Sequence, residues 1–417
     1  MATRLKVNVQ ESYIKILIIL GSLTIFGFNC APIISLIILI YQLFHIHKNR
    51  FKYNHIVWML LILLMIGIIN VIVCYRRYND NLFTGLTGLY ALLIPFGYNL
   101  GLDYFNNDEK RENIIGFVIN CFTILCILAF VQRVTGVNIF PYTFRNGSIR
   151  IRGISLGFFA QILVFSKIIS NNFKKSDIIK ALIMLLYLVF ISQSRGGVIT
   201  LSFSFLYVIM KRIWRKKNIT SILRTLILII TVFSVFIILN NIGYIDKVMS
   251  FTTEIIEKSG SGSARIGELE FYYSKLLKNP FWGIGIIKGG TSLETKIYGM
   301  DIWYFIDDTG LMGFVFQTGI VGAAWLFTLF VLIIRRIVKL LKIQNSQSTV
   351  IAYALTMVII TSVIGFVFTD YILSKNSSFL FFLLLSMADS TINENEDLIL
   401  KGGGFYEDSN NYIPSCD

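Results

Sequence analysis

Charged residues are scarce in this sequence. Asp, Glu, Lys and Arg make up only 15% of its 417 residues, whereas 55% are hydrophobic and the mean hydropathy is +0.69. A soluble domain could not bury so much apolar surface, so the composition excludes that class of protein. Long apolar runs separated by short polar segments are typical of transmembrane helices. The sequence therefore predicts an all-α polytopic membrane protein.

Histidine and cysteine are also rare, and their positions limit the chemistry. The three histidines, His45, His47 and His55, cluster around one connection near the N-terminus. The five cysteines show no spacing typical of a metal site, and we interpret them as small apolar side chains. We therefore expect no metal and no cofactor. Acid–base chemistry elsewhere in the chain must use Asp or Glu.

About twelve transmembrane helices are expected, because each crossing needs roughly 20 apolar residues. The expected spans are Tyr13–Phe28, Ala31–Ile46, His55–Cys74, Leu82–Leu100, Ile114–Val131, Ile154–Ser170, Ile178–Ile191, Val198–Met210, Ile222–Ile242, Gly310–Ile334, Val350–Phe368 and Ser378–Ala388. Residues 1–392 thus form one transmembrane domain. The polar tail, residues 393–417, is expected to be disordered and cytoplasmic.

Lysine and arginine mark the loops expected on the cytoplasmic side. Basic clusters follow alternate spans and include Lys48, Arg50, Lys52, Lys174, Lys175, Lys211, Arg212, Arg215, Lys216, Lys217, Arg335, Arg336, Lys339 and Lys342. This alternation places both termini in the cytoplasm. The net charge of +14 also fits contact with anionic membrane lipid, and we expect no nucleic-acid partner.

The longest connection, residues 243–307, is expected outside the cell, and loops of this length are usually functional. Its segment Ala264–Lys278 has the periodicity of an amphipathic helix, stopped by Asn279-Pro280. We expect this helix to lie on the membrane surface or to cap the bundle. Its expected apolar face is Ile266, Leu269, Tyr273, Leu276 and Leu277, and its expected polar face is Arg265, Glu268, Tyr272 and Lys275.

Several arginines fall on the outer side, against the usual distribution of positive charge. They are Arg76, Arg77, Arg133, Arg145, Arg150, Arg152, Arg195 and Arg265. The planar guanidinium group matches phosphate oxygens well, so the cluster indicates an anionic ligand close to the membrane, such as a lipid diphosphate. The alternative is that these are solvated loop charges, paired with Asp80 or with lipid headgroups.

Arg195 is the arginine with the strongest functional indication. It lies in Ser192-Gln-Ser-Arg-Gly-Gly197, between two apolar runs with almost no loop. Glycine permits a sharp turn, so backbone amides, the Ser194 hydroxyl and the guanidinium could converge on a phosphate near Gly196. The alternative is a tight turn that carries one charge.

Two adjacent carboxylates, Asp307 and Asp308, precede the span that begins at Gly310. One of them could act as general base on a sugar hydroxyl, and because neighbouring helical residues diverge only one is expected to reach the site. The alternative is helix N-capping, which the helix dipole favours and which needs no function.

The order of several short motifs resembles the O-antigen ligase and polymerase superfamily. The motifs are Arg152-Gly153, Ser194-Arg-Gly196, Arg265 at the start of a helix, Asn279-Pro-Phe-Trp-Gly-Ile-Gly285 and Gly319-Ile-Val-Gly322. The resemblance is sharpest from about Ile154 to Trp325. It implies a membrane glycosyltransferase of the bacterial plasma (inner) membrane that uses undecaprenyl-diphosphate-linked glycans as donor and acceptor.

The resemblance also implies roles for individual residues. The arginines that hold the diphosphate in the family correspond to Arg195 and Arg265, with Arg152, Ser194 and Gly196 beside them. The ligases typically have a histidine near the position of Asp308, so this sequence favours the polymerase branch. Such a polymerase would work with a flippase and with chain-length regulator proteins. The proposed reaction is metal-independent, with Asp308 or Asp307 as the base.

Other functions remain open from the residues alone. A ligase would transfer a finished glycan to another acceptor, and a flippase would carry lipid-linked glycans across the membrane. A flippase would need polar residues deep in its spans and an internal repeat, and neither is evident. A peptidoglycan glycosyltransferase of the shape, elongation and division type has a similar outer loop but fits the outer arginines less well. A receptor or structural subunit is a further alternative.

Overall fold

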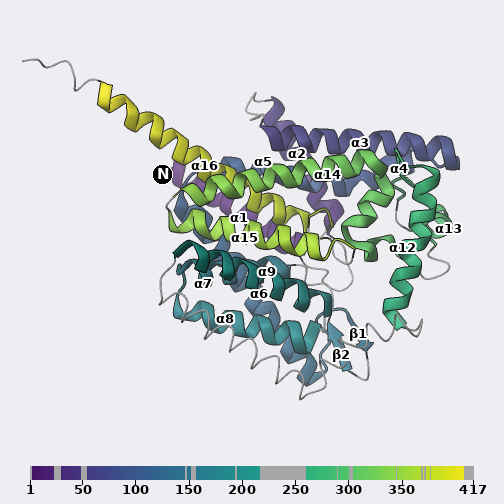
Figure 1. Cartoon of the computed structure of the whole chain (residues 1–417), viewed down its shortest axis with the longest axis horizontal. Coiled ribbons are helices and arrows are strands. Elements are labelled where there is room, and N and C mark those ends of the chain that lie inside the picture. The colour runs from purple at the N-terminus through teal and green to yellow at the C-terminus, as the bar shows by residue number, and fades with distance from the viewer. Residues whose placement is uncertain are drawn as a thin grey trace, which may run out of the picture.

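The structure is a computed structural model of the whole chain. It describes residues 2–22, 30–47, 54–145, 148–151, 156–192, 195–216, 260–288, 290–299, 304–343, 345–367, 370, 372–375 and 377–407. The expected span Ile222–Ile242 lies outside these residues. In Figure 1 the main helices run side by side along one long direction, and α12 and α13 lie together at one end of the bundle.

Helices account for nearly all the described secondary structure. Their bounds are α1 Ala2–Ser22, α2 Ala31–His47, α3 His55–Tyr78, α4 Leu82–Gly88, η1 Leu89–Phe96, α5 Gly97–Tyr104, α6 Asp108–Thr135, α7 Leu156–Ser170, α8 Lys175–Leu186, η2 Tyr187–Ser192, α9 Arg195–Lys216, α12 Gly260–Lys278, α13 Ser292–Tyr298, η4 Ile306–Thr309, α14 Gly310–Lys342, α15 Ser346–Ile364 and α16 Ser378–Glu407. Strands β1 (Tyr142–Arg145) and β2 (Ser148–Ile151) pair antiparallel. The all-α prediction is confirmed, with this one hairpin added.

Five of the described helical segments are long and apolar enough to cross a membrane. They are His55–Tyr78, Leu82–Tyr104, Asp108–Thr135, Ile306–Lys342 and Ser346–Ile364. Shorter apolar helices occur at Ala31–Phe44, Leu156–Ser170 and Gly197–Lys211. Every expected span within the described residues contains helix, but the total of twelve crossings stays a prediction.

The outward surface of the bundle is apolar. Large side chains such as Trp58, Met65, Ile124, Leu182 and Phe327 are more than half exposed. A water-soluble protein rarely leaves so many large apolar groups uncovered, whereas a bilayer solvates them. These faces identify a membrane protein whose helices meet lipid on the outside and pack on one another inside.

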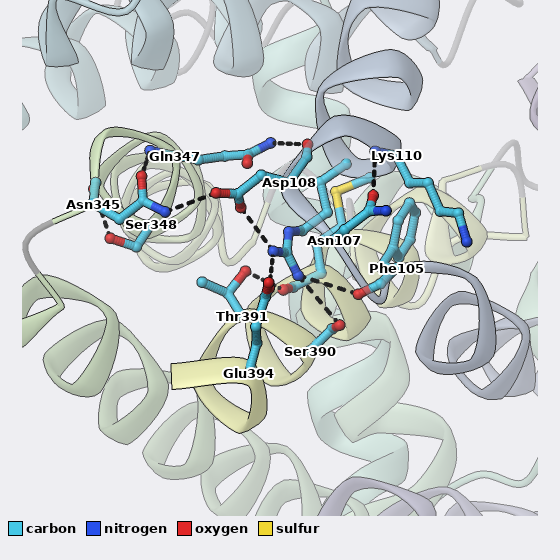
Figure 2. A network of polar contacts seen from close by, with 12 residues as sticks. Phe105, Asn107, Asp108, Lys110, Asn345, Gln347, Ser348, Ser390, Thr391 and Glu394 are labelled. Atoms are coloured by element: carbon cyan, nitrogen blue, oxygen red, sulfur yellow. Dashed lines mark hydrogen bonds and ion pairs between the residues drawn. The ribbon is translucent and has the colours of Figure 1, made fainter. Parts of the chain in front are cut away.

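One end of the bundle is held together by buried ion pairs. Arg111 of α6 is fully buried and donates to Asp108, Phe105 O, Ser390 and Glu394. Figure 2 shows Asp108 reached also by Asn345, whose Nδ2 lies 2.8 Å from Asp108 Oδ2. These contacts tie α6, α15 and α16 together. Because this end carries the basic loops, we refer to it as the inner end and to the opposite end as the outer end.

The first part of the expected tail is helical in the structure, because α16 continues from Ser378 to Glu407. Its side chains beyond Asn393 make contacts that composition alone does not reveal. Glu394 pairs with Arg111 and Glu396 lies 3.0 Å from Lys339. Residues 408–417 lie outside the described residues.

The outer end carries a small folded unit with its own core, which we call the cap. It consists of α12, the segment 279–288, α13, η4 and the beginning of α14. Its buried residues form, with Cys74 of α3, a cluster separate from the main core: Tyr272, Ile284, Ile287, Tyr298, Ile306 and Phe316. Part of the expected outer connection is therefore a packed structure rather than a loose loop.

The cap joins the bundle where α14 breaks. Gly319 has φ 68° and ψ −154°, which interrupts the helix. The amides of Ile284 and Gly285 donate to Phe316 O and Gln317 O at 2.8 and 2.9 Å, and the Ile320 amide donates to Pro280 O at 2.8 Å. The segment Asn279–Gly285 thus satisfies backbone groups that the break exposes, as a spanning helix requires.

Glycine is required at this junction on both sides. A Cβ on Gly319 would lie 2.4 Å from Phe281 O, and a Cβ on Gly283 would lie 2.4 Å from Phe316 O. Gly283 also has a positive φ of 65°. The glycines of two sequence motifs therefore serve one purpose, which is the close approach of two backbones.

We predict that Gly319→Ala destabilises the protein. The φ and ψ of Gly319 are nearly exclusive to glycine, so strain alone costs about 1–3 kcal/mol, and the overlap with Phe281 O adds to it. The matched control is Gly116→Ala in α6, where a Cβ meets nothing within 4 Å. Thermal unfolding in one detergent should show a lower midpoint for Gly319→Ala and an unchanged or higher midpoint for Gly116→Ala. Equal midpoints would contradict the assigned role of the break.

Candidate functional site

Helix α12 buries against the cap two residues of the face that the sequence predicted to be polar. Tyr272 is fully buried and Glu268 is only 3% exposed, whereas Ile266, Tyr273 and Leu277 are exposed. The predicted helix is confirmed and ends at Lys278. Leu269 and Leu276 of the expected apolar face also pack against the core of the cap, so the buried side of α12 combines residues of both expected faces.

Buried hydrogen bonds fix α12 to the rest of the cap. The Tyr272 hydroxyl donates to Tyr298 O at 2.8 Å. The Tyr298 hydroxyl in turn donates to Gly285 O at 2.7 Å and accepts from the Ile287 amide and Gln317 Nε2, both at 3.1 Å. Tyr298 therefore links α12, the segment after Asn279 and the broken part of α14.

Asp307 and Asp308 lie in η4, at the outer mouth of α14. The side chain of Asp307 is 82% exposed, and Asp308 is exposed as well. Neither residue is the N-cap of α14, because Thr309 occupies that position and its side chain makes no cap hydrogen bond. The capping alternative is therefore wrong, and both carboxylates are left at the surface of the cap.

Arg265 meets this turn directly. Its Nη1 lies 3.1 Å from the carbonyl oxygen of Asp308. One side of the guanidinium is thereby fixed to the backbone of the turn. The structure thus brings together two residues that the sequence singled out, forty-three positions apart in the chain.

The connection between α15 and α16 adds residues that sequence reasoning missed. Lys375 Nζ lies 3.9 Å from Asp307 Oδ2, and both side chains are well exposed, so the pair is weak. Asp370 accepts from the amides of Ile372 and Leu373 at 3.0 and 2.8 Å. The Met312 amide donates to Phe366 O at 3.1 Å and holds this connection against α14.

Burial shifts the protonation of carboxyl groups around the turn. Desolvation raises the pKa of Asp370 to about 6, against the stabilising amides, and the charge of Asp307 adds to the increase. Desolvation also raises the pKa of Glu268, with Asp308 contributing, although the Phe305 amide and Arg265 oppose it. The pKa of Glu294 is raised by burial too. Carboxyl groups with raised pKa values are common at functional sites.

The remaining predicted site residues are only partly visible. Helix α9 begins at Arg195, so the backbone of Arg195 and Gly196 forms a helix N-terminus, a position that favours anions. The side chain of Arg195 lies outside what the structure describes, and so do Ser194 and Arg152. Their convergence with Arg265 stays a prediction.

Two other outer arginines have structural roles. Arg77 Nη1 donates to Gly283 O at 2.7 Å, and Arg133 donates to Phe190 O. Tyr78 adds a hydrogen bond to Ile284 O at 3.0 Å. The guanidinium groups of Arg77 and Arg133 each hold a backbone carbonyl, and anion binding by the outer arginines stays a prediction.

The comparison with known families supports the resemblance seen in the sequence. Residues 181–327 match the family model described as O-antigen ligase, which confirms the similarity to the O-antigen ligase and polymerase superfamily over that segment. The segment contains Ser194, Arg195, Gly196, Arg265, Asp307 and Asp308, and also the break at Gly319. No curated protein matches the chain. The segment is thus similar to membrane enzymes that handle glycans.

We predict a pH-dependent stability difference between the protein and its Asp370→Asn variant. Because folding raises the pKa of Asp370 to about 6 from 3.8, the folded state binds this proton more tightly. The stabilisation of the folded state by the protonated Asp370 side chain is fully present below about pH 4 and is lost as the pH rises through 6. Asparagine keeps an acceptor oxygen for the amides but does not titrate.

The measurement is the thermal midpoint of both proteins in one detergent between about pH 4 and pH 7.5. The wild type should gain stability relative to Asp370→Asn as the pH falls from about 6 to about 4, and the difference should be constant above that. A difference that is constant over the whole range would contradict the raised pKa of Asp370.

Proposed function

We propose that this protein is a polymerase that joins undecaprenyl-diphosphate-linked oligosaccharide units into a surface polysaccharide on the outer face of the plasma membrane. The contact between Arg265 and the Asp308 carbonyl supports this proposal most strongly. It sets a fixed cation, suited to a diphosphate, beside exposed carboxylates suited to a sugar hydroxyl. The match of residues 181–327 to the O-antigen ligase family supports the same class of reaction.

In the proposed reaction an acceptor hydroxyl oxygen attacks the anomeric carbon of the donor glycan. The bond between that carbon and the diphosphate oxygen breaks, and Asp308 takes the hydroxyl proton. The leaving undecaprenyl diphosphate carries the electron pair. Its charge grows as the bond breaks, so Arg195 and Arg265 stabilise the transition state more than the bound donor. No metal takes part in this proposal.

Orientation follows from the two ends of the bundle. The described basic residues of the α14–α15 and α7–α8 connections belong to the inner end, which we assign to the cytoplasm. The cap then faces the outside, where flipped lipid-linked glycans would arrive. A flippase and chain-length regulators are proposed as partners on this basis.

A ligase is the second candidate, because the matching family is described as O-antigen ligase. A ligase would use the same donor site but pass a finished glycan to a different acceptor. The absence of histidine from the sequence beyond His55 argues for a carboxylate base and thereby for the polymerase.

We predict that Arg195→Ala, Arg265→Ala and Asp308→Asn each abolish long chains in cells. Loss of one transition-state contact in a dry site costs about 2–4 kcal/mol, or roughly 10²–10³ in rate. The matched control is Arg76→Ala, because Arg76 is an exposed outer arginine in the last turn of α3 that has no role in the proposed reaction. A deletion strain carrying each variant would be analysed for surface glycan, with membrane insertion checked by immunoblot.

The surface glycan made by the deletion strain distinguishes a polymerase from a ligase and from a flippase. A displayed single repeat unit without long chains supports a polymerase. Long chains that are made but not displayed would indicate a ligase, and lipid-linked units left on the cytoplasmic face would indicate a flippase. Normal chain length from Arg195→Ala would refute the proposed donor site.

A further inference from the structure

Glu268 is a buried carboxyl group that the proposed reaction does not use. It lies on α12, one turn after Arg265, and is 3% exposed. Its Oε1 accepts from the Phe305 amide at 3.2 Å. Its Oε2 is buried and has no hydrogen-bond partner among the described residues. A carboxyl group with one unsatisfied buried oxygen is costly to keep, so its presence calls for a specific role.

Among the described residues, the hydrogen bond of the Glu268 side chain is made with the turn that carries the candidate base. Glu268 holds the amide of Phe305 at the beginning of η4, and Arg265 holds the carbonyl of Asp308 within it. Residues three apart on a helix share one face, so one face of α12 contacts the turn at two points, Phe305 and Asp308. Any shift of α12 therefore moves Arg265 and Asp308 together.

Hydrogen bonds within the turn, from Thr309 Oγ1 to Ile306 O at 2.7 Å and from the Asp308 amide to Phe305 O at 3.0 Å, hold its backbone, and the polar contacts from α12 add to them. The side chains of Asp307 and Asp308 are exposed, and Thr309 provides no side-chain cap to α14. The positive φ of 62° at Gly310, directly after the turn, separates its conformation from that of the helix. Helix α12 thus contacts this turn at both of its ends, at the Phe305 amide and at the Asp308 carbonyl.

We propose that Glu268 is a positioning residue for glycosyl transfer, which fixes the Phe305–Asp308 turn so that Asp308 faces the acceptor hydroxyl beside the donor diphosphate held by Arg265. This inference rests on the proposed function. Glu268 itself touches no substrate and acts through the backbone amide of Phe305.

The test compares Glu268→Ala with Glu268→Gln in the purified full chain in proteoliposomes. Release of undecaprenyl diphosphate from a lipid-linked repeat unit gives kcat and KM. The matched control is Glu270→Gln, because Glu270 is exposed on the same helix two residues away. Thermal midpoints of all variants are measured in parallel.

Glu268→Ala should lower kcat by about 10²-fold, as expected when a reacting group is displaced by roughly 1 Å. The KM for the donor should stay within about twofold, because the arginines still bind the diphosphate. Glu268→Gln keeps an acceptor oxygen for the Phe305 amide and should recover kcat to within about threefold. The Glu270→Gln protein should match the wild type.

Two results would overturn the positioning role. One is a wild-type kcat for Glu268→Ala. The other is a loss of kcat in both Glu268 variants together with a lowered thermal midpoint in both. That result would indicate a purely structural contact. If the wild type releases no undecaprenyl diphosphate at all, the proposed function fails instead, so the two failures are distinguishable.

Discussion

The backbone pairing between Asn279–Gly285 and the broken part of α14 is the interaction on which the outer end depends. A break within a long apolar helix exposes carbonyl and amide groups that lipid cannot satisfy. The segment after α12 supplies the missing partners through Pro280 O and the amides of Ile284 and Gly285. Gly283 and Gly319 make this possible because a side chain at either position would collide with the backbone of the opposite segment.

The position of the candidate site follows from this pairing. Tyr298 connects the paired segment to α12, and α12 carries Arg265 and Glu268 to the two ends of the Phe305–Asp308 turn. At the inner end, Arg111 and the bidentate pair of Arg336 with Asp389 hold the opposite ends of the helices. Such buried pairs fix an arrangement at some cost in desolvation. The helices of the bundle are thus joined by ion pairs at the inner end, and the cap lies at the opposite end (Figure 1).

The sequence predicted much of this, because its main signals are local. Apolar runs located the helices, and periodicity located α12 and its end at Asn279-Pro280. Periodicity did not reveal that Tyr272 and Glu268 of the expected polar face are buried, because their partners Tyr298 and Phe305 lie further along the chain. Asp370 and Lys375 were missed because they lie in a short connection without a motif, and only the fold brings them to η4. The helix beyond Asn393 was missed because Glu394 and Glu396 pair with residues far away in the chain.

The central claim is that the paired segment positions Arg265 for a lipid diphosphate, and binding tests it most directly. The measurement is the affinity of the purified protein in nanodiscs for undecaprenyl diphosphate, compared among the wild type, Arg265→Ala and Gly319→Ala. Gly319 is not one of the proposed ligand contacts, so the Gly319→Ala protein, measured well below its thermal midpoint, reports on the pairing that positions α12. The account predicts weaker binding for both variants. Wild-type affinity in Gly319→Ala, or no binding by the wild type, would contradict it.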